Sequence, residues 1–161
     1  MKRNLTLGIM LLSVLFAIFF HQYQFRHLNE EIALSYFIAH HVKSNIYLDS
    51  IDYSKPVKVY HVKKGDKFIQ YQIEGAPQGN FYALEGATPS KLGINDMGYD
   101  PESKMKLKKQ KRTYIATKDF DALSSYAAPV VDDWSTPEDE TQTEGHELQF
   151  FTTCKPCFTR F

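Results

Sequence analysis

Residues Ser124–Ser135 read Ser-Ser-Tyr-Ala-Ala-Pro-Val-Val-Asp-Asp-Trp-Ser, and they place two acids, an indole and three serines within twelve residues. Pro129 fixes its own φ angle and biases Ala128 toward an extended conformation, so this part of the chain is expected to be strand or polyproline II rather than helix. Val130 and Val131 then form a short buried strand that ends at the acids. Carboxylates just beyond an apolar strand sit where a cleft can use them, so the stretch predicts part of a binding site.

The end of this stretch supplies three candidate site residues, Asp132, Asp133 and Trp134. The carboxylates are available for chemistry, and the indole offers a flat face on which a base or a pyridine ring stacks. The alternative interpretation is a turn in which an aspartate caps backbone amides and the tryptophan fills the core.

Segments rich in β-branched and aromatic residues predict strands on both sides of that stretch. Lys58–Val62 and Lys67–Ile73 are joined by Lys63-Lys64-Gly65-Asp66, which predicts a hairpin. Asn80–Leu84 follows a Gly/Pro-rich loop, and Glu147–Thr153 forms a final strand. Together these segments indicate an antiparallel sheet.

The residues Ser124–Ser135 are called the Pro129 stretch below. Between the predicted strand Asn80–Leu84 and this stretch, the sequence predicts a loop, a basic strand and a short helix. Glu85–Pro101 is a long loop with one helical turn at Ser90–Gly93. Lys104–Arg112 is a strong charge run, interpreted as a solvated edge strand continuing into Thr113–Thr117 rather than as a phosphate-contacting stripe. Asp119–Tyr126 is expected to be a short helix or turn.

Met1–Phe25 has the pattern of a targeting segment, because Lys2 and Arg3 precede the apolar run Leu5–Phe20. The length of that run is intermediate between the apolar core of a signal peptide and the ~20 residues of a membrane-spanning helix. The sequence is therefore compatible with either a cleaved signal peptide or a signal anchor. Residues 19–24 lack the small residues that a signal peptidase prefers, which favours the anchor. The positive-inside rule then places the body outside the cytoplasm, as an exported or membrane-anchored protein.

Leu28–Tyr47 predicts an amphipathic helix with Asn29 as its N-cap. Its apolar stripe consists of Leu28, Ile32, Tyr36, Ala39 and Val42. The expected organisation is a signal or anchor at residues 1–25, a helical segment at 26–56 and one body domain at 57–161.

Composition bounds the partners of this chain. Its 161 residues, 43% of them hydrophobic, support one compact domain with an appendage. Lys and Arg total 19, as do Asp and Glu, so net charge does not favour nucleic acid as a partner. Cys154 and Cys157 predict a small disulfide loop in an oxidising compartment. No second Cys/His pair has zinc-ligand spacing, so no metal is expected.

Several residues of the Pro129 stretch follow the signature of a toxin family. The stretch resembles that of the polymorphic toxin type 46 family, which runs basic-Ser-Thr-x-x-Pro-x-x-Asp-x-x-Ser/Thr. The matching positions are Ser125, Pro129, Asp132 and Ser135. Ser124 and Tyr126 depart from the pattern, which has a basic residue and Thr there.

Four further blocks look like successive parts of the same domain, so the resemblance covers roughly Gly65–Phe158. They are Lys67–Gln72, Gly79–Ala83, Pro89–Ile94 and Thr143–Phe151. The last block also departs from the family, whose Gly-rich run appears here as Gly145-His146-Glu147-Leu148.

The resemblance implies an α+β fold of ADP-ribosyltransferase-like type, with a small split antiparallel sheet across which NAD lies. It implies an NAD(P)+ glycohydrolase, with NAD(P)+ as substrate and no separate cofactor. Gln70 and Asp132 fall on the family's functional pair, with Gln72 and Asp133 as the alternatives under a register shift. The carboxylate would stabilise the ribosyl cation or accept a proton from water, and the amide would bind ribose hydroxyls or orient that water.

Five more residues are expected around the substrate. Ser125 would hydrogen-bond the nicotinamide ribose, and Gln149 would complete the pocket from the last strand. Tyr71, Phe81 or Trp134 would stack on the nicotinamide ring.

Three alternatives stay open. ADP-ribosyl transfer would need a catalytic glutamate near the last strand, for which Glu147 is the available residue. A ribonuclease toxin would use Lys104–Arg112 for phosphate contacts. An inactive descendant would keep the fold and bind NAD without turnover, as the changes at Ser124, Tyr126 and His146 permit. A toxin of this kind allows for an immunity protein as a second partner.

Overall fold

The computed structural model describes residues 2–43, 46–100, 102–132 and 140–161. In chain order the elements are α1 (Lys2–Ala39), α2 (Ile46–Asp49), β1 (Lys58–Val62), β2 (Lys67–Gln72), β3 (Phe81–Ala83), the 3-10 turn η1 (Ser90–Leu92), β4 (Met97–Tyr99), β5 (Lys106–Lys108), β6 (Gln110–Ala116), β7 (Phe120–Tyr126), β8 (Val131–Asp132), β9 (Thr141–Gln142), β10 (Leu148–Phe151), η2 (Lys155–Cys157) and β11 (Phe158–Arg160).

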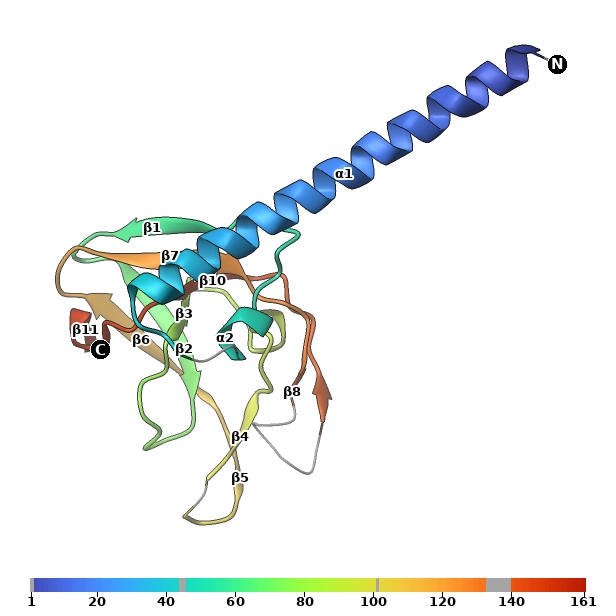
Figure 1. The fold of residues 1–161 in the computed structure, drawn as a ribbon. Helices are drawn as coiled ribbons and strands as arrows, with labels where there is room; N and C mark the ends of the chain where they lie inside the picture. The colour runs from blue at the N-terminus through green and yellow to red at the C-terminus, as the bar shows by residue number, and fades with distance from the viewer. Residues whose placement is uncertain (1, 44–45, 101, 133–139) are drawn as a thin grey trace.

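Seven strands form a single sheet in the order β1-β7-β10-β3-β2-β6-β11, and all neighbouring pairs are antiparallel. Two small antiparallel ribbons, β4–β5 and β8–β9, stand apart from it. The long helix α1 lies across β1, β7 and β10, and its N-terminal part projects away from the body (Figure 1). The predicted α+β class with an antiparallel sheet is confirmed.

Two local predictions about the sheet are wrong. β1 and β2 do not form a hairpin, because β1 pairs with β7 while β2 pairs with β3 and β6. The segment expected as a short helix is instead β7, which lies between β1 and β10. β7 buries Ala122 on one face and Leu123 on the other. A strand buried on both faces does not show the alternating pattern from which strands are predicted.

The basic run is two strands rather than one edge strand. β5 pairs only with β4 in a small ribbon, and the chain bends at Lys109 before β6. β6 lies inside the sheet between β2 and β11. The lysines of β5 are exposed, in agreement with the predicted solvated strand. The position of β6 between two other strands was not predicted.

The sheet curls around an aromatic core to which all seven of its strands contribute. The contributing residues are Val62, Phe68, Tyr82, Tyr114, Ala116, Ala122, Phe150 and the partly buried Phe158. Phe158 of β11 stacks on Tyr82 at 4.2 Å between ring centroids, and it meets Phe120 of β7 at 5.1 Å. Because strands from both ends of the sheet reach the same rings, the sheet must be strongly curved.

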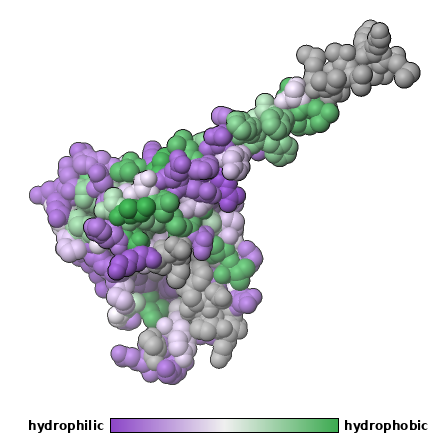
Figure 2. Space-filling view, in the orientation of Figure 1, coloured by the Kyte–Doolittle hydropathy of each residue, from purple (hydrophilic) through white to green (hydrophobic). Residues whose placement is uncertain are grey.

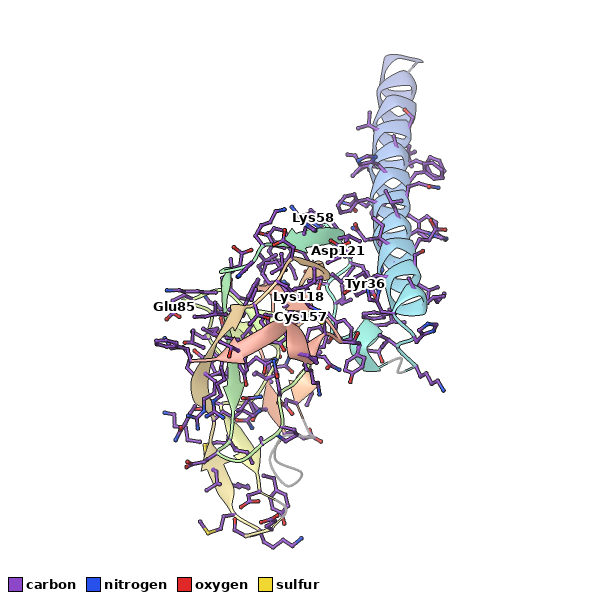
Figure 3. The ribbon with its side chains drawn as sticks, turned by 90° about the vertical axis from the view of Figure 1, so that its left-hand side faces the viewer. Tyr36, Lys58, Glu85, Lys118, Asp121 and Cys157 are labelled. Atoms are coloured by element: carbon purple, nitrogen blue, oxygen red, sulfur yellow. A yellow bond between two sulfur atoms is a disulfide. The ribbon has the colours of Figure 1, made fainter. Side chains whose placement is uncertain are left out.

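The opposite face of the sheet is covered by α1. Ala33, Tyr36 and Phe37 of the helix pack with Leu123 and Phe151 in a second core. The Tyr36 hydroxyl donates to the carbonyl oxygens of Asp121 at 3.1 Å and Phe151 at 3.3 Å. Figure 3 shows Tyr36 beside Asp121 where the helix meets the sheet. The phenol donates in its neutral form, which burial favours further by raising the pKa of Tyr36 above the ordinary 10.0.

Asn29 is not the N-cap that the sequence suggested. α1 runs without a break from Lys2 to Ala39, so the predicted start at Asn29 and end at Tyr47 are both wrong. Asn29 is buried within the helix, and its Nδ2 donates to the carbonyl oxygens of Tyr53 at 3.0 Å and Lys55 at 2.9 Å. Its Oδ1 accepts from the Val57 N–H at 3.1 Å. The residue therefore ties α1 to the segment that leads into β1.

Apolar side chains are exposed along the projecting part of α1, as the green surface in Figure 2 shows. They include Leu12, Leu15, Phe16, Phe19, Phe20 and Tyr23. Among the residues that the structure describes, no helix has an apolar stretch long enough to cross a membrane.

The predicted disulfide is confirmed. Cys154 and Cys157 are bonded, with their Cα atoms 5.3 Å apart. The loop they close joins β10 to β11, and the Cys157 carbonyl accepts from the Thr117 N–H at 2.8 Å. The disulfide thus fixes the short connection that returns the chain to β6.

Replacing Asn29 by alanine is expected to destabilise the fold. The change removes the hydrogen-bond partner of the buried Val57 N–H and of two carbonyl groups. We therefore expect a loss of about 2–3 kcal/mol in the free energy of unfolding. Urea denaturation measures this loss. The control is Leu34→Ala, an exposed position of the same helix, which should stay within about 0.5 kcal/mol of the parent protein. Equal losses in both variants would contradict the role of Asn29.

Candidate active site

A cavity of about 710 Å³ opens beside β2 and β3. One wall comes from these two strands, and another from residues 92–94 with Gly98 and Lys109. Ala128, Val130 and Gln149 add a third side, and α2 with the residue after it closes a fourth. The walls are mainly apolar and aromatic with a few amide groups, which is typical of a small-molecule site.

The family-like blocks of the sequence meet around this cavity. β2 and β3 carry two of them, and η1 carries the third. The Gly145 N–H donates to the Ser90 carbonyl at 3.1 Å, and the Glu147 N–H donates to the Lys91 carbonyl at 3.1 Å. The Ala127 N–H donates to the Glu147 carbonyl at 2.9 Å. The closing block therefore holds η1 on one side and the Pro129 stretch on the other.

Gly145 is required where these segments cross. Its φ angle is +68°, a conformation that L side chains rarely adopt. A Cβ atom there would come within 2.6 Å of the Ala128 carbonyl carbon, and closer still to the nitrogen of Pro129. No side chain fits between this turn and the Pro129 stretch.

Gln70 reaches the cavity with its amide held in one orientation. Nε2 donates to the Phe81 carbonyl at 2.6 Å, while Oε1 accepts from Gln72 Nε2 at 3.0 Å and from the Gly79 N–H at 3.3 Å. The Gln72 amide is fixed in turn, because its Oε1 accepts from the Tyr114 hydroxyl at 2.8 Å. Within the described part of the chain, one N–H of Gln70 has a partner and the other is available as a donor.

Gln149 lines the cavity from β10. Its Nε2 donates to the Ser50 carbonyl at 3.0 Å and to Ser125 Oγ at 3.4 Å. Ser125 is fully buried in β7 and does not belong to the described cavity lining. The serine supports Gln149 and is not placed to meet a ligand directly.

Tyr71 and Phe81 both line the cavity. The Tyr71 hydroxyl donates to the Ala87 carbonyl at 2.8 Å, which fixes the ring near the cavity mouth. The Phe81 ring is held by Tyr47 and Phe151, at centroid distances of 5.8 and 5.1 Å. Both rings are therefore held in place by their surroundings.

The predicted acids differ from the glutamines in their position. Asp132 is fully buried, and its Oδ2 accepts from the Asn95 N–H at 2.6 Å. It is not among the described residues that line the cavity. Asp133 and Trp134 lie outside the described residues. Glu147 precedes β10 and is half-buried outside the described lining, and its carboxylate accepts from the N–H of the next residue, Leu148, at 3.4 Å.

Two residues near the cavity were missed from the sequence. Lys109 lines the wall, and its Nζ donates to the Asn95 carbonyl at 2.9 Å. Burial lowers the pKa of Lys109, and the charges of Asp132 and Asp96 partly counteract that effect. In the sequence Lys109 is one lysine of a basic run, and only the bend between β5 and β6 distinguishes it. Asn95 lies in a loop with no motif, so no local signal marks it.

Comparison with known proteins identifies the family of this chain. The model of the family described as Bacterial toxin 46 matches residues 20–158, and this chain belongs to that family of toxins. The chain is 33% identical over 134 residues to the NAD(P)(+) glycohydrolase toxin Tse6 of Pseudomonas aeruginosa. That alignment covers 81% of this chain and 31% of the relative, so this chain spans less than a third of the length of Tse6.

One solved structure gives the same relationship. The chain superposes on the structure of Tse6 in complex with Tsi6 with a TM-score of 0.73 and 30% identity, covering 85% of this chain and 96% of that one. A remoter likeness is to Rhs1-CT in complex with its cognate immunity protein RhsI1, with a TM-score of 0.45, 15% identity and coverage of 66% and 78%.

A histidine also joins the closing block to the segment after α2. His146 Nδ1 lies 3.1 Å from Asp52 Oδ2. Burial by itself would raise the pKa of Asp52, but hydrogen bonds from Ser54 and His146 outweigh burial and lower it below the ordinary 3.8. The charged carboxylate is thus favoured by the folded structure.

Replacing Gly145 by alanine should disrupt the site through its backbone. Gly75 provides a matched control, because its φ is +77° and nothing lies within 4 Å of a Cβ there. Both variants carry the strain of an alanine at positive φ. Only Gly145→Ala also places its Cβ atom against the backbone of Ala128 and Pro129. We expect Gly145→Ala to lose at least about 2 kcal/mol more stability than Gly75→Ala in chemical denaturation. Equal losses would show that the close crossing does not exist.

Asp52 should make the fold sensitive to acid. Because its folded pKa lies below 3.8, its stabilising contribution is present above that pH and is lost as the pH falls through the folded value. We expect Asp52→Asn to flatten the dependence of the melting temperature on pH in this acid range. A slope identical to that of the parent protein would contradict the assignment.

Proposed function

We propose that this chain is a toxin that hydrolyses the bond between nicotinamide and ribose in NAD(P)+. The observation that carries the proposal is the cavity beside Gln70, in a chain similar over most of its length to an NAD(P)(+) glycohydrolase toxin. The cavity volume lies within the range of small-molecule sites. Tyr71 and Phe81 supply flat apolar surfaces, and Gln70 and Gln149 supply amide groups.

The reaction suits a site with few titrating groups. Nicotinamide leaves NAD+ as a neutral molecule from a cationic precursor, so its departure needs no general acid. What the protein must do is stabilise the oxocarbenium-like ribosyl centre and position a water molecule. The available N–H of Gln70 can bind a ribose hydroxyl or that water, since the amide is already oriented by Gln72 and Phe81. Asp132 completes the pair that the family resemblance implies, and its burial suggests an indirect contribution.

Hydrolysis is favoured over ADP-ribosyl transfer by the position of Glu147. A transferase would need this carboxylate at the reacting ribose. Glu147 is outside the described cavity lining, and its carboxylate accepts from the N–H of the adjacent Leu148. Water is therefore the proposed acceptor of the ribosyl group.

We further infer that the curved sheet and its cavity are of the ADP-ribosyltransferase-like type. A protein inhibitor is proposed as a partner, because the similar toxin Tse6 is found in complex with Tsi6. Export from the cytoplasm is proposed because disulfides such as Cys154–Cys157 persist in oxidising compartments.

Release of nicotinamide from NAD+ and NADP+ by the purified full chain tests the function. We expect release by the parent protein and a roughly 10²-fold slower reaction for Gln70→Ala, because one oriented donor is lost. The control is Gln110→Ala, an exposed glutamine on β6 paired directly with Gln72, which should keep the parent rate.

Binding of NAD+ without release would instead identify an inactive descendant of the family. Absence of both release and binding would overturn the proposal. Salt-sensitive binding of RNA would then favour the ribonuclease alternative.

A further inference from the structure

Asn95 is a buried residue at which at least four hydrogen bonds converge. Its N–H donates to Asp132 Oδ2 at 2.6 Å, and its carbonyl accepts from Lys109 Nζ at 2.9 Å. Its Nδ2 donates to Thr141 Oγ1 at 2.7 Å, and its Oδ1 accepts from the Met97 N–H at 2.9 Å. One residue therefore joins the loop before β4, the bend between β5 and β6, and the β8–β9 ribbon, which lie together at the lower end of the body in Figure 1.

These hydrogen bonds lie directly behind one wall of the cavity. Ile94 precedes Asn95 and lines the cavity, as do Gly98 and Lys109. The packing there is close, since a Cβ on Gly98 would come within 2.7 Å of Ile73 Cγ2. A shift of Asn95 therefore moves atoms that a ligand would touch.

Asp132 and Thr141 hold Asn95 from the same side. They face each other in the β8–β9 ribbon, and both accept hydrogen bonds from Asn95. The ribbon thus hydrogen-bonds both the backbone and the side chain of Asn95. The carboxylate of Asp132 also stabilises the charge of Lys109, whose Nζ binds the other side of Asn95.

We propose that Asn95, Asp132 and Thr141 form a latch that positions the cavity wall made by Ile94 and Lys109. In this role Asp132 is a positioning residue that acts on the substrate through Asn95. The inference rests on the proposed function, because the wall affects a reaction only if NAD(P)+ occupies the cavity.

The latch and a direct catalytic carboxylate have different kinetic signatures. A loosened wall lowers the population of the binding-competent cavity, and this raises KM in proportion. A carboxylate that acts on the reacting atoms contributes to the transition state, so its loss lowers kcat. Thr141, which contacts Asn95 but lies outside the described cavity lining, separates the two cases.

The central variants are Thr141→Val, which removes the acceptor of the Asn95 side chain, and Thr141→Ser, which keeps it. In the full chain we expect Thr141→Val to raise KM for NAD+ about tenfold, and to speed amide hydrogen exchange in residues 92–97 by a similar factor. Thr141→Ser should restore both values. Asp96→Asn is the control for charge, because it removes an exposed carboxylate whose charge acts on Lys109 while the hydrogen bonds of the latch stay in place.

Asp132 is examined through two substitutions. Asp132→Asn retains an oxygen that can accept from the Asn95 N–H, so its KM should lie between those of the parent and Asp132→Ala. In both variants the loss of kcat/KM should come mainly from KM rather than from kcat. Melting temperatures identify any variant that fails to fold, in which case the Thr141 pair decides the question.

Unchanged KM and unchanged exchange in Thr141→Val would overturn the latch. A kcat for Asp132→Asn as low as that of Asp132→Ala, at unchanged KM, would also overturn it and would identify a direct carboxylate. Faster exchange in Thr141→Val together with a parent protein that releases no nicotinamide would support the latch and overturn the proposed function.

Discussion

The antiparallel pairing between residues 120–132 and residues 141–151 is the constraint on which the rest of the structure depends. It begins as the β7–β10 ladder, continues through the hydrogen bond between Ala127 and Glu147, and ends as the β8–β9 ribbon. At the β7–β10 ladder, the buried Ser125 supports Gln149. At the β8–β9 ribbon, Asp132 accepts a hydrogen bond from Asn95. The turn at Gly145 lets the two segments approach closely enough for both. One long pairing therefore positions opposite sides of the cavity.

Buried polar groups, rather than apolar packing alone, fix the parts around this pairing. Asn29 and Tyr36 orient α1 on the sheet through hydrogen bonds to backbone groups far away in sequence. The chain of bonds from Tyr114 through Gln72 to Gln70 fixes one amide in the cavity in the same manner. Because an unpaired buried polar group is costly, each of these arrangements has few alternatives. The cavity is thus preorganised by its supporting residues.

Sequence reasoning succeeded where the signal was local and failed where long-range partners decide the structure. The β-branched and aromatic residues of β1 and β2 identified both strands, but nothing in the intervening turn reveals that each pairs elsewhere. Asparagine is a common residue at helix N-caps, so the sequence placed Asn29 there. Its position inside the helix is explained only by the distant carbonyl groups to which it donates. Among the site residues, the family resemblance led to Gln70, and strand position led to Gln149, both of which line the cavity. Asn95 could not be found, because its function comes from segments that meet only in three dimensions.

The central claim is that NAD(P)+ occupies the cavity between β2 and the loop that carries Ile94. A crystal structure of the full chain with a non-hydrolysable NAD+ analogue tests it most directly. The account predicts the nicotinamide ring against Tyr71 or Phe81, an N–H of Gln70 within hydrogen-bonding distance of the ribose or its attacking water, and Asp132 buried without ligand contact. An analogue bound elsewhere, or one whose ribose contacts the Asp132 carboxylate directly, would contradict it.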